Sequence, residues 1–307
     1  MASELDPYVQ DHEENDRRLD RRSGPRQEDQ AVSVNRNSPA AKGLLQSALA
    51  LGPVRRTVRR AADWVDLQYS FILEQIAKAA PRARGRLLDV GCGDKPYEPT
   101  FRPYVTEYIG IEHEGVFAQT NASTSERRPD LYYDGNRLPF GDASFDTVLS
   151  IQVLEHTPRP VPLLREMARV LRPGGLLILS APFSGRLHEE PFDFFRYTPH
   201  GLRAMCAEAG LEVTEVWDQG NIWSVIGHKL NSFLAFRVAG IQGLAMQIGK
   251  HEQETSQGPK SKSRPWTLPV VAPAMFAIAS GARVLDRVAP DVTESLSYMI
   301  FARHRAG

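Results

Sequence analysis

Cysteine is scarce in this sequence, neither sign of charge is in excess, and the N-terminus has no apolar segment. The two cysteines, Cys92 and Cys206, stand far apart, so they provide neither a disulfide framework nor, by themselves, a metal site. We expect both to be reduced thiols in a cytoplasmic protein. The 37 basic and 37 acidic residues cancel, which argues against a protein that binds nucleic acid with its whole surface.

The residues after Met1 soon become highly charged, so we expect no secretory signal peptide. The length of 307 residues, 42% of them hydrophobic, suits one α/β domain with appendages. We predict a disordered polar tail at 1–40, N-terminal helices at 41–84, a ligand-binding core at 85–218, a helical insertion or lid at 219–291 with a flexible part at 250–264, and a last strand at 292–307 that completes the core.

Short apolar runs alternate with helical patterns through the middle of the chain. Pro162–Val170 and Thr198–Ala209 have the spacing of amphipathic helices. The predicted strands are 86–90, 108–112, 131–134, 144–151, 176–180, 211–217 and 295–303. Strands that alternate with helices predict an α/β fold with a mostly parallel sheet, covered by helices on both faces.

The first strand runs directly into a Gly-x-Gly turn, which is a nucleotide-binding geometry. Gly91 and Gly93 let the backbone turn sharply and let a ligand approach without a Cβ in the way. Glu112 follows Gly91 by 21 positions, at the end of the next strand, where a carboxylate accepts hydrogen bonds from both ribose hydroxyls of an adenosine ligand. These features suit NAD and S-adenosylmethionine equally.

Three details favour S-adenosylmethionine over a dinucleotide. The third glycine of a dinucleotide fingerprint is missing, because Asp94-Lys95-Pro96 follows the turn and makes a poor site for a pyrophosphate. Asp134-Gly135 ends the third strand, where a side-chain acceptor can take the adenine amino group. A single strand after the sixth leaves no second mononucleotide-binding half. An NAD(P)-dependent oxidoreductase and a non-catalytic binding protein of the same fold are the alternatives.

Ordered motifs along the chain resemble those of a known family. The run Leu87–Gly93 looks like the first motif of class I S-adenosylmethionine-dependent methyltransferases. Four further segments resemble later motifs of the methyltransferase type 11 group, in order and at the right spacing: Leu138–Phe140, Ser144–Asp146, Val153–His156 and Val170–Gly175. The likeness covers 86–217 and the last strand, and it implies a Rossmann-like sheet of seven strands with an antiparallel last strand.

The resemblance also implies roles for particular residues. Asp89, Gly91, Cys92 and Gly93 would line the methionine and ribose end of the cofactor, Glu112 would bind the ribose, Asp134 and Gly135 would hold the adenine, and Ile151 and Gln152 would border the methyl group. The connection His113–Asp130 is short and polar, so the usual second helix is expected to be missing or frayed. Asp94–Tyr97, His188–Thr198 and Trp223–Gly227 resemble a bacterial subfamily associated with surface-glycan or lipid-linked biosynthesis.

The segment His188–Tyr197 crowds acids, a histidine, an arginine and aromatics beyond the fifth strand, at the edge where α/β sheets bind ligands. An oxygen acceptor needs a general base, for which His188 and Glu189 are candidates, with His156 third. A solvated loop or an ion-pair cluster is the alternative. The spacing of His188, Glu189, Glu190 and Asp193 matches no strong metal site, so no metal is expected.

The acceptor is expected to be a small molecule, a glycan or a lipid-linked compound, and no nucleic acid is expected as a partner. Trp266–Ala282 carries no charge but contains Pro269 and Pro273, and it is short for a membrane span, so it predicts a buried or interfacial helix. Segments 41–60, 221–241 and 266–282 are candidates for peripheral contact with the inner face of a membrane. A lid over the substrate cleft is the alternative.

Overall fold

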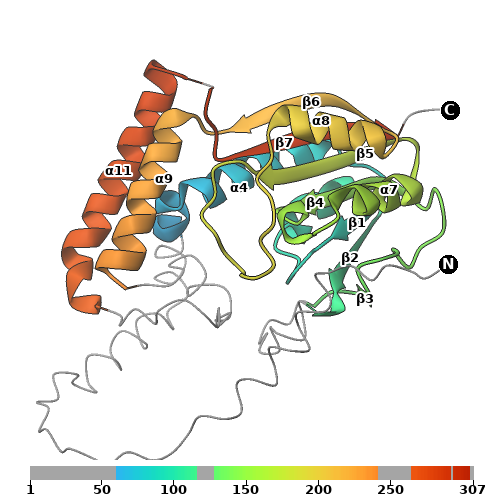
Figure 1. Ribbon diagram of the computed structural model, residues 1–307, viewed down its shortest axis with the longest axis horizontal. Helices are drawn as coiled ribbons and strands as arrows, with labels where there is room; N and C mark the ends of the chain where they lie inside the picture. The colour runs from blue at the N-terminus through green and yellow to red at the C-terminus, as the bar shows by residue number, and fades with distance from the viewer. Residues whose placement is uncertain (1–59, 116–127, 241–263, 292, 305–307) are drawn as a thin grey trace, which may run out of the picture. The chain divides into compact units, whose positions relative to one another are not determined.

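The computed structural model describes residues 60–115, 128–240, 264–291 and 293–304 (Figure 1). All of these belong to one unit of the chain, residues 49–307. The predicted tail at 1–40, the basic apolar stretch at 41–59, most of the connection 113–130 and almost all of the polar part at 250–264 lie outside the described residues.

Seven strands form one sheet in the order β3-β2-β1-β4-β5-β7-β6. Neighbouring strands are parallel from β3 to β5, whereas β7 is antiparallel to both β5 and β6. This confirms the predicted Rossmann-like α/β fold with an antiparallel last strand. The strands are β1 (Arg86–Val90), β2 (Glu107–His113), β3 (Leu131–Tyr133), β4 (Phe145–Ile151), β5 (Leu171–Pro182), β6 (Leu211–Gln219) and β7 (Ser297–His304).

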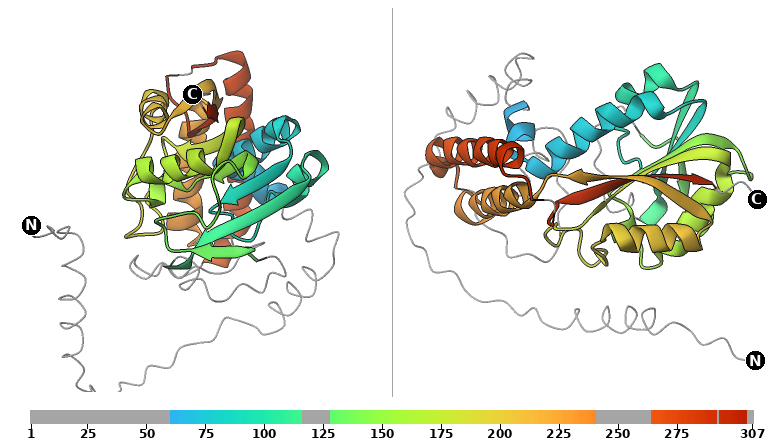
Figure 2. Two further views of the ribbon diagram at one scale, coloured as in Figure 1. Left: turned by 90° about the vertical axis from the view of Figure 1, so that its right-hand side faces the viewer. Right: turned by 90° about the horizontal axis from the view of Figure 1, so that it is seen from above.

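Helices cover both faces of the sheet (Figure 2). On one face, α4 (Leu67–Ala79) and the short α5 (Glu98–Phe101) pack over apolar side chains of β1, β4 and β7. On the other face, α7 (Pro160–Val170) and α8 (Pro199–Glu208) cover a second apolar cluster. Because the central strands are buried on both sides, they are apolar almost throughout rather than alternating. Short 3-10 turns are η2 (Ala80–Arg82), η3 (Arg102–Tyr104), η4 (Leu154–His156) and η6 (Pro265–Thr267).

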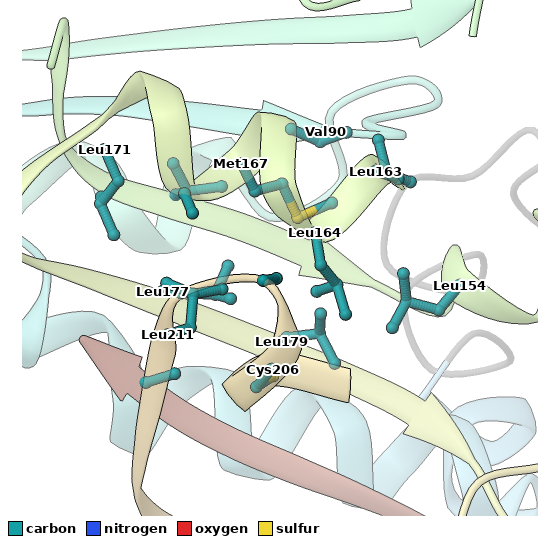
Figure 3. Packing of buried hydrophobic residues seen from close by; sticks show 14 of the residues in the cluster. Val90, Leu154, Leu163, Leu164, Met167, Leu171, Leu177, Leu179, Cys206 and Leu211 are labelled. Carbon is teal, nitrogen blue, oxygen red and sulfur yellow. The ribbon is translucent and has the colours of Figure 1, made fainter. Parts of the chain in front are cut away.

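Leucines and small side chains interlock between α7, α8 and the sheet (Figure 3). Leu164 and Met167 of α7 are fully buried against Leu177 and Leu179 of β5 in the same cluster. Cys206 of α8 fills a position in this core, and burial raises the pKa of its thiol to about 12. Cys206 therefore acts as a small apolar side chain, and both cysteines are free.

The insertion before the last strand contains two helices that lie side by side (Figures 1 and 2). α9 (Ile222–Phe233) follows β6 and continues as a π-helical turn, η5 (Leu234–Val238). α11 (Leu268–Val288) has 21 residues. It is longer than the predicted segment 266–282 because Pro269 stands in its first turn and the helix continues past Pro273.

Two boundaries differ from the predicted elements. Asp66 separates α4 from the residues before it, because its side chain accepts a hydrogen bond from the Tyr69 N–H (3.1 Å) and caps α4. β5 begins at Leu171 rather than at the predicted residue 176, because Leu171 already pairs with Phe145 of β4 before the register shifts. In both places a hydrogen bond decides the element.

The buried α7 leucine gives a direct test of this packing. Leu164→Ala is expected to lower the free energy of unfolding by about 2–5 kcal/mol, because it leaves a cavity among rigid neighbours. Arg165→Ala, the next residue, is the control: its ion pair with Glu208 is exposed, so the loss is expected to stay below about 1 kcal/mol. Urea denaturation measures both, and equal losses would contradict the assignment of Leu164 to the core.

Candidate active site

The loops after β1 and β4 meet at the point where the strand order reverses. In open α/β sheets this switch point is where ligands bind, outside the carboxyl ends of the strands. A Cβ added to Gly91, after β1, would lie 2.4 Å from Cγ2 of Val153, after β4. The two loops are therefore in contact, and glycine at position 91 is required by the lack of space as well as by its φ of +74°.

The glycine turn is tied to the neighbouring strand and open on its other side. The N–H groups of Gly91 and Cys92 both donate to the Ile111 carbonyl, at 2.9 and 3.1 Å. Gly93 has a φ of +50°, and no atom of the described residues lies within 4 Å of the place of its Cβ. A ligand can approach the backbone closely there.

Glu112 lies beside this open backbone at the end of β2. One carboxylate oxygen accepts a hydrogen bond from the Gly93 N–H (2.8 Å), and the other accepts one from the His113 N–H (2.9 Å). Burial raises the pKa of Glu112, while these two backbone hydrogen bonds lower it. A carboxylate has about four lone-pair sites, so acceptor capacity remains for ribose hydroxyls. These residues fit the ribose of an adenosine cofactor.

Asp89 and Cys92 lie beneath the turn rather than on its open side. Asp89 is buried and accepts a hydrogen bond from the Tyr108 hydroxyl of β2. Cys92 is buried as well, and a Cβ on Gly110 would lie 2.7 Å from its sulfur. Burial raises the pKa of the Cys92 thiol far above its usual range, so it packs rather than reacts. The predicted contact of these two residues with the cofactor stays a prediction.

On the adenine side, Asp134 holds its own turn. Its carboxylate accepts hydrogen bonds from the N–H groups of Asn136 (2.9 Å) and Arg137 (3.3 Å), which lower its pKa. Gly135, with φ of +81°, lies against His113, whose Nε2 would be 2.6 Å from an added Cβ. No sequence pattern indicated His113 as a site residue. The structure adds it between Glu112 and Gly135, and the predicted adenine contacts remain predictions.

Gln152 begins a row of polar side chains across the carboxyl ends of β4, β5 and β6. Its backbone has a φ of +55°, and its amide donates to the Ser180 hydroxyl (2.9 Å). Ser180 in turn donates to Gln219 (3.0 Å), and Gln68 of α4 donates to Gln152 (3.3 Å). Ile151 is buried in the core beneath α4, so Gln152 is the polar member of this predicted pair.

The three predicted candidates for the general base come together in the fold. His156 ends η4, and His188 and Glu189 lie in the loop after β5. The two imidazole rings lie edge to face with centroids 4.8 Å apart, and Nε2 of His156 is 3.7 Å from Oε2 of Glu189. Glu155, which the sequence did not indicate, joins them with Oε1 3.9 Å from the same nitrogen. We call these four residues the histidine cluster.

An ion pair holds the loop that carries His188. Both guanidinium nitrogens of Arg196 donate to Asp193, at 2.6 and 2.7 Å, and Asp193 also accepts a hydrogen bond from the His188 N–H (2.9 Å). The Phe194 N–H donates to the Glu155 carbonyl (2.8 Å), which joins the loop to η4. The predicted alternative of an ion-pair cluster is thus also present, and it positions the histidine.

Electrostatics connects the histidine cluster with the cofactor pocket. Glu189 is close enough to Glu112 for its charge to contribute to the raised pKa of Glu112. Burial raises the pKa of Glu155 to about 8 and lowers the pKa of His188. Because β1, β4 and β5 are parallel, the loops that follow them, which carry the glycine turn and the cluster, lie at the same edge of the sheet.

The helices α9 and α11 expose an apolar surface. By length and composition α11 could cross a membrane, and 22% of its most apolar stretch is buried. This exposure argues against a fully buried helix, and contact with a membrane stays a prediction. α9 and η5 contact the loop of the histidine cluster, because Lys229 of α9 donates to the Ser184 carbonyl (2.7 Å) and the Arg186 guanidinium lies 3.6 Å from the ring centroid of Phe236 in η5. Exposed large apolar residues on the two helices are Ile226, Leu230, Phe233, Val270, Phe276, Val284, Leu285 and Val288.

Comparison with known families assigns the segment that builds the pocket. Residues 88–179 match the family described as "Methyltransferase domain". The matched residues begin in β1 and end in β5, and they include Gly91, Glu112, Gln152 and Glu155. This segment of the chain is therefore similar to methyltransferase domains. S-Adenosylmethionine is the cofactor that the match implies, as the motifs predicted.

Curated relatives agree over a similar length. An uncharacterized methyltransferase of Mycobacterium tuberculosis H37Rv is 40% identical over 106 residues, which are 32% of this chain and 42% of the relative. Another, of Mycobacterium avium strain 104, is 40% identical over 111 residues, 34% of this chain and 44% of the relative. The chain thus spans less than half the length of these relatives.

Solved structures resemble the chain in fold at low identity. The 4+2 cyclase SpnF is 21% identical, with a TM-score of 0.47 over 78% of this chain and 83% of that one. An S-adenosylmethionine-dependent methyltransferase from Mesorhizobium loti is 14% identical, with a TM-score of 0.44 over 77% of this chain and 99% of that one. At these identities the likeness concerns the fold alone.

The contact between the two loops predicts how the glycine turn responds to substitution. Gly91→Ala combines an unfavourable positive φ with a clash against Val153, so it is expected to lower the melting temperature and to abolish cofactor binding. Gly174→Ala is the matched control: its φ is +71°, but nothing lies within 4 Å of its Cβ among the described residues. It is expected to cost only about 1–2 kcal/mol and to retain binding. Equal effects in thermal unfolding would show that the loops do not touch.

Proposed function

We propose that the protein transfers a methyl group from S-adenosylmethionine to an oxygen of a small-molecule, glycan or lipid-linked acceptor. The observation that carries the proposal is the Glu112 carboxylate beside the open backbone of Gly93, inside the segment that matches a methyltransferase domain. The acceptor classes rest on the resemblance in His188–Thr198 and on the apolar surface of α9 and α11 next to that loop.

Bound S-adenosylmethionine would supply a methyl group attached to a sulfonium sulfur. The methyl group bonds to an acceptor atom as the carbon–sulfur bond breaks, and the electron pair of that bond stays on sulfur. Glu112 binds the ribose hydroxyls, and Gly91 and Gly93 let the cofactor approach the backbone. Asp134 and Gly135 hold the adenine end. Gln152 borders the methyl group with an amide that Ser180 and Gln68 hold in place. The chain thus supplies orientation and excludes water.

The histidine cluster handles the proton of the acceptor hydroxyl. His156, His188 and Glu189 lie within reach of one another at the edge of the sheet where the acceptor enters. Each imidazole is held by its Nδ1, through the Phe192 carbonyl for His156 (2.7 Å) and the Arg186 carbonyl for His188 (3.1 Å). A carbonyl only accepts, so the proton of each neutral ring sits on Nδ1 and the lone pair on Nε2. Nε2 of His156 lies 3.7 Å from Oε2 of Glu189.

The alternatives differ in what they bind. An NAD(P)-dependent oxidoreductase is disfavoured because β7 lies antiparallel between β5 and β6, which leaves no second mononucleotide-binding half. A non-catalytic protein of the same fold would lack cofactor binding or acceptor turnover. Ligand-dependent stability separates these possibilities.

S-Adenosylmethionine, but not NADH, is expected to raise the melting temperature of the purified chain. Glu112→Gln is expected to weaken S-adenosylmethionine binding about tenfold or more, because an amide presents one acceptor atom where the carboxylate presents two. Glu107→Gln, at the start of the same strand in an exposed ion pair with Arg86, should bind as the wild type does.

Thermal shift and isothermal titration measure both quantities. Stabilisation by NADH alone would replace the proposal with the oxidoreductase. The absence of any shift with S-adenosylmethionine or its demethylated product would support a non-catalytic protein.

A second proposal concerns location: we infer that the chain is cytoplasmic and contacts the inner face of a membrane through α9 and α11. Large apolar side chains on these helices are exposed, and basic side chains such as Lys229, Arg237 and Arg287 are exposed beside them. An apolar face bordered by basic residues is typical of helices that lie in the plane of an anionic bilayer surface. Of the candidate segments, 41–59 lies outside the described residues.

Co-sedimentation with vesicles containing phosphatidylserine tests this surface. Phe233→Asp is expected to lower the partition coefficient between vesicles and water about tenfold, which the bound fraction reports. The reason is that an exposed aromatic that enters the bilayer contributes about 1.5–3 kcal/mol to binding. Tyr104→Asp, a similarly exposed aromatic in η3, is the control and should bind unchanged. Wild-type protein that stays in the supernatant would exclude membrane contact, and the alternative, a lid over the substrate cleft, would remain.

A further inference from the structure

We propose that Glu155, His156 and His188, completed by Glu189, form a binding site for a divalent transition-metal cation such as Zn²⁺. One donor atom from each of the first three residues lies within 4.8 Å of the other two. The inference goes beyond the proposed function, because a cation can bind here whether or not the chain transfers methyl groups.

The strongest observation is the side chain of Glu155. It is fully buried, and neither carboxylate oxygen has a hydrogen-bond partner among the described residues. Burying a carboxyl group without partners costs several kcal/mol when it is charged, so such groups are rare unless something neutralises them. Nε2 of His156 lies 3.9 Å from Oε1 of Glu155, which is too long for a hydrogen bond. A cation between these atoms would neutralise the carboxylate.

The histidines are oriented as metal ligands are. Nδ1 of His156 lies 2.7 Å from the Phe192 carbonyl, and Nδ1 of His188 lies 3.1 Å from the Arg186 carbonyl. A carbonyl is an acceptor only, so the proton of each neutral ring must sit on Nδ1 and the lone pair on Nε2. Metal-binding histidines in proteins almost always donate their second N–H to a carbonyl or carboxylate in this way.

The Asp193 carboxylate also contacts His188, at the Nδ1 side of the ring. Asp193 lies 3.3 Å from Nδ1 of His188 and is held by two hydrogen bonds from Arg196. This arrangement resembles the carboxylate–histidine pairs that fix ring orientation around zinc. Since Asp193 is occupied in this way, it is not itself a ligand, and Glu189 is the second carboxylate that faces the site.

The distances suit a small cation. Tetrahedral zinc ligands at about 2.0–2.1 Å from the metal lie about 3.4 Å from one another. The separations from Nε2 of His156 to Glu155 (3.9 Å) and to Glu189 (3.7 Å) exceed this value by at most half an ångström. The donor atoms of Glu155, His156 and His188 lie within 4.8 Å of one another, so side-chain rotations have to bring them closer to close the site. The Phe194 N–H and the Tyr197 hydroxyl anchor the loop to η4 (2.8 and 2.7 Å).

The donor set selects the class of metal. Two imidazoles with one or two carboxylates suit Zn²⁺, Fe²⁺, Mn²⁺ or Co²⁺, whereas Mg²⁺ and Ca²⁺ prefer oxygen ligands alone. The site lies near the cofactor pocket, since Glu189 acts electrostatically on Glu112. If the proposed function holds, an acceptor oxygen is the natural additional ligand. With the Nε2 lone pairs bound to the cation, the cation rather than an imidazole would then make the acceptor's proton easier to remove.

The experiment uses the full chain, stripped with a chelator and titrated with Zn²⁺ against a chromogenic competitor. We expect one Zn²⁺ per chain, with no competition from Mg²⁺. His156→Ala and His188→Ala are each expected to weaken binding about tenfold or more. His200→Ala, an exposed histidine on α8, is the matched control and should bind as the wild type does. Wild-type protein that binds no Zn²⁺, or cluster variants that bind as tightly as His200→Ala, would overturn the proposal.

Glu155→Gln separates a ligand from a structural residue. It keeps the size of the side chain and removes the buried charge, so the metal-free chain should melt at the same or a higher temperature while Zn²⁺ binding weakens. A residue needed only for folding would lower the melting temperature and leave Zn²⁺ affinity unchanged. The thermal shift with S-adenosylmethionine, measured on the same samples, reports on the proposed function independently: a failed shift leaves the metal result standing, and the reverse also holds.

Discussion

Strand β1 lies in the middle of the sheet, paired in parallel with β2 on one side and β4 on the other. Buried on both faces, it leaves the core at its carboxyl end between Ile111 of β2 and Val153 in the loop after β4. Gly91 makes that turn against Val153 with no room for a side chain, and the N–H of Gly93 reaches the Glu112 carboxylate (2.8 Å). The position of the cofactor pocket follows from this crowding.

The carboxylates of Glu112 and Glu155 have different surroundings, and these surroundings suit them to different partners. Glu112 is satisfied by two backbone N–H groups and keeps acceptor capacity toward the open side of the turn. Glu155 is buried at the start of the neighbouring loop, with neither oxygen hydrogen-bonded among the described residues. The first suits neutral hydroxyl donors, and the second needs a proton or a cation. The charge of Glu189, in the histidine cluster, contributes to the raised pKa of Glu112.

Much of the fold could be predicted because hydrophobic periodicity and turn residues are properties of short segments of the sequence. The apolar run of β1, the alternation of strands with helices and the position of the glycine turn are all written in short segments. Boundaries were less predictable where a single hydrogen bond decides them, as at Asp66, or where pairing extends a strand, as at Leu171. The length and exposure of α11 also depended on its partner α9, which no local pattern specifies.

The sequence by itself determined the sheet, the cofactor class and the residues of the glycine turn, because these depend on neighbours in the chain and on one regular spacing between strands. The tertiary structure decided which side chains lie next to the histidines. Within the segment after β5 alone, His188 and Glu189 have no metal-like spacing. Only when η4 returns beside that loop do Glu155 and His156 join them. Contacts between distant segments are set by the packing of the whole sheet, and spacing along the chain cannot report them.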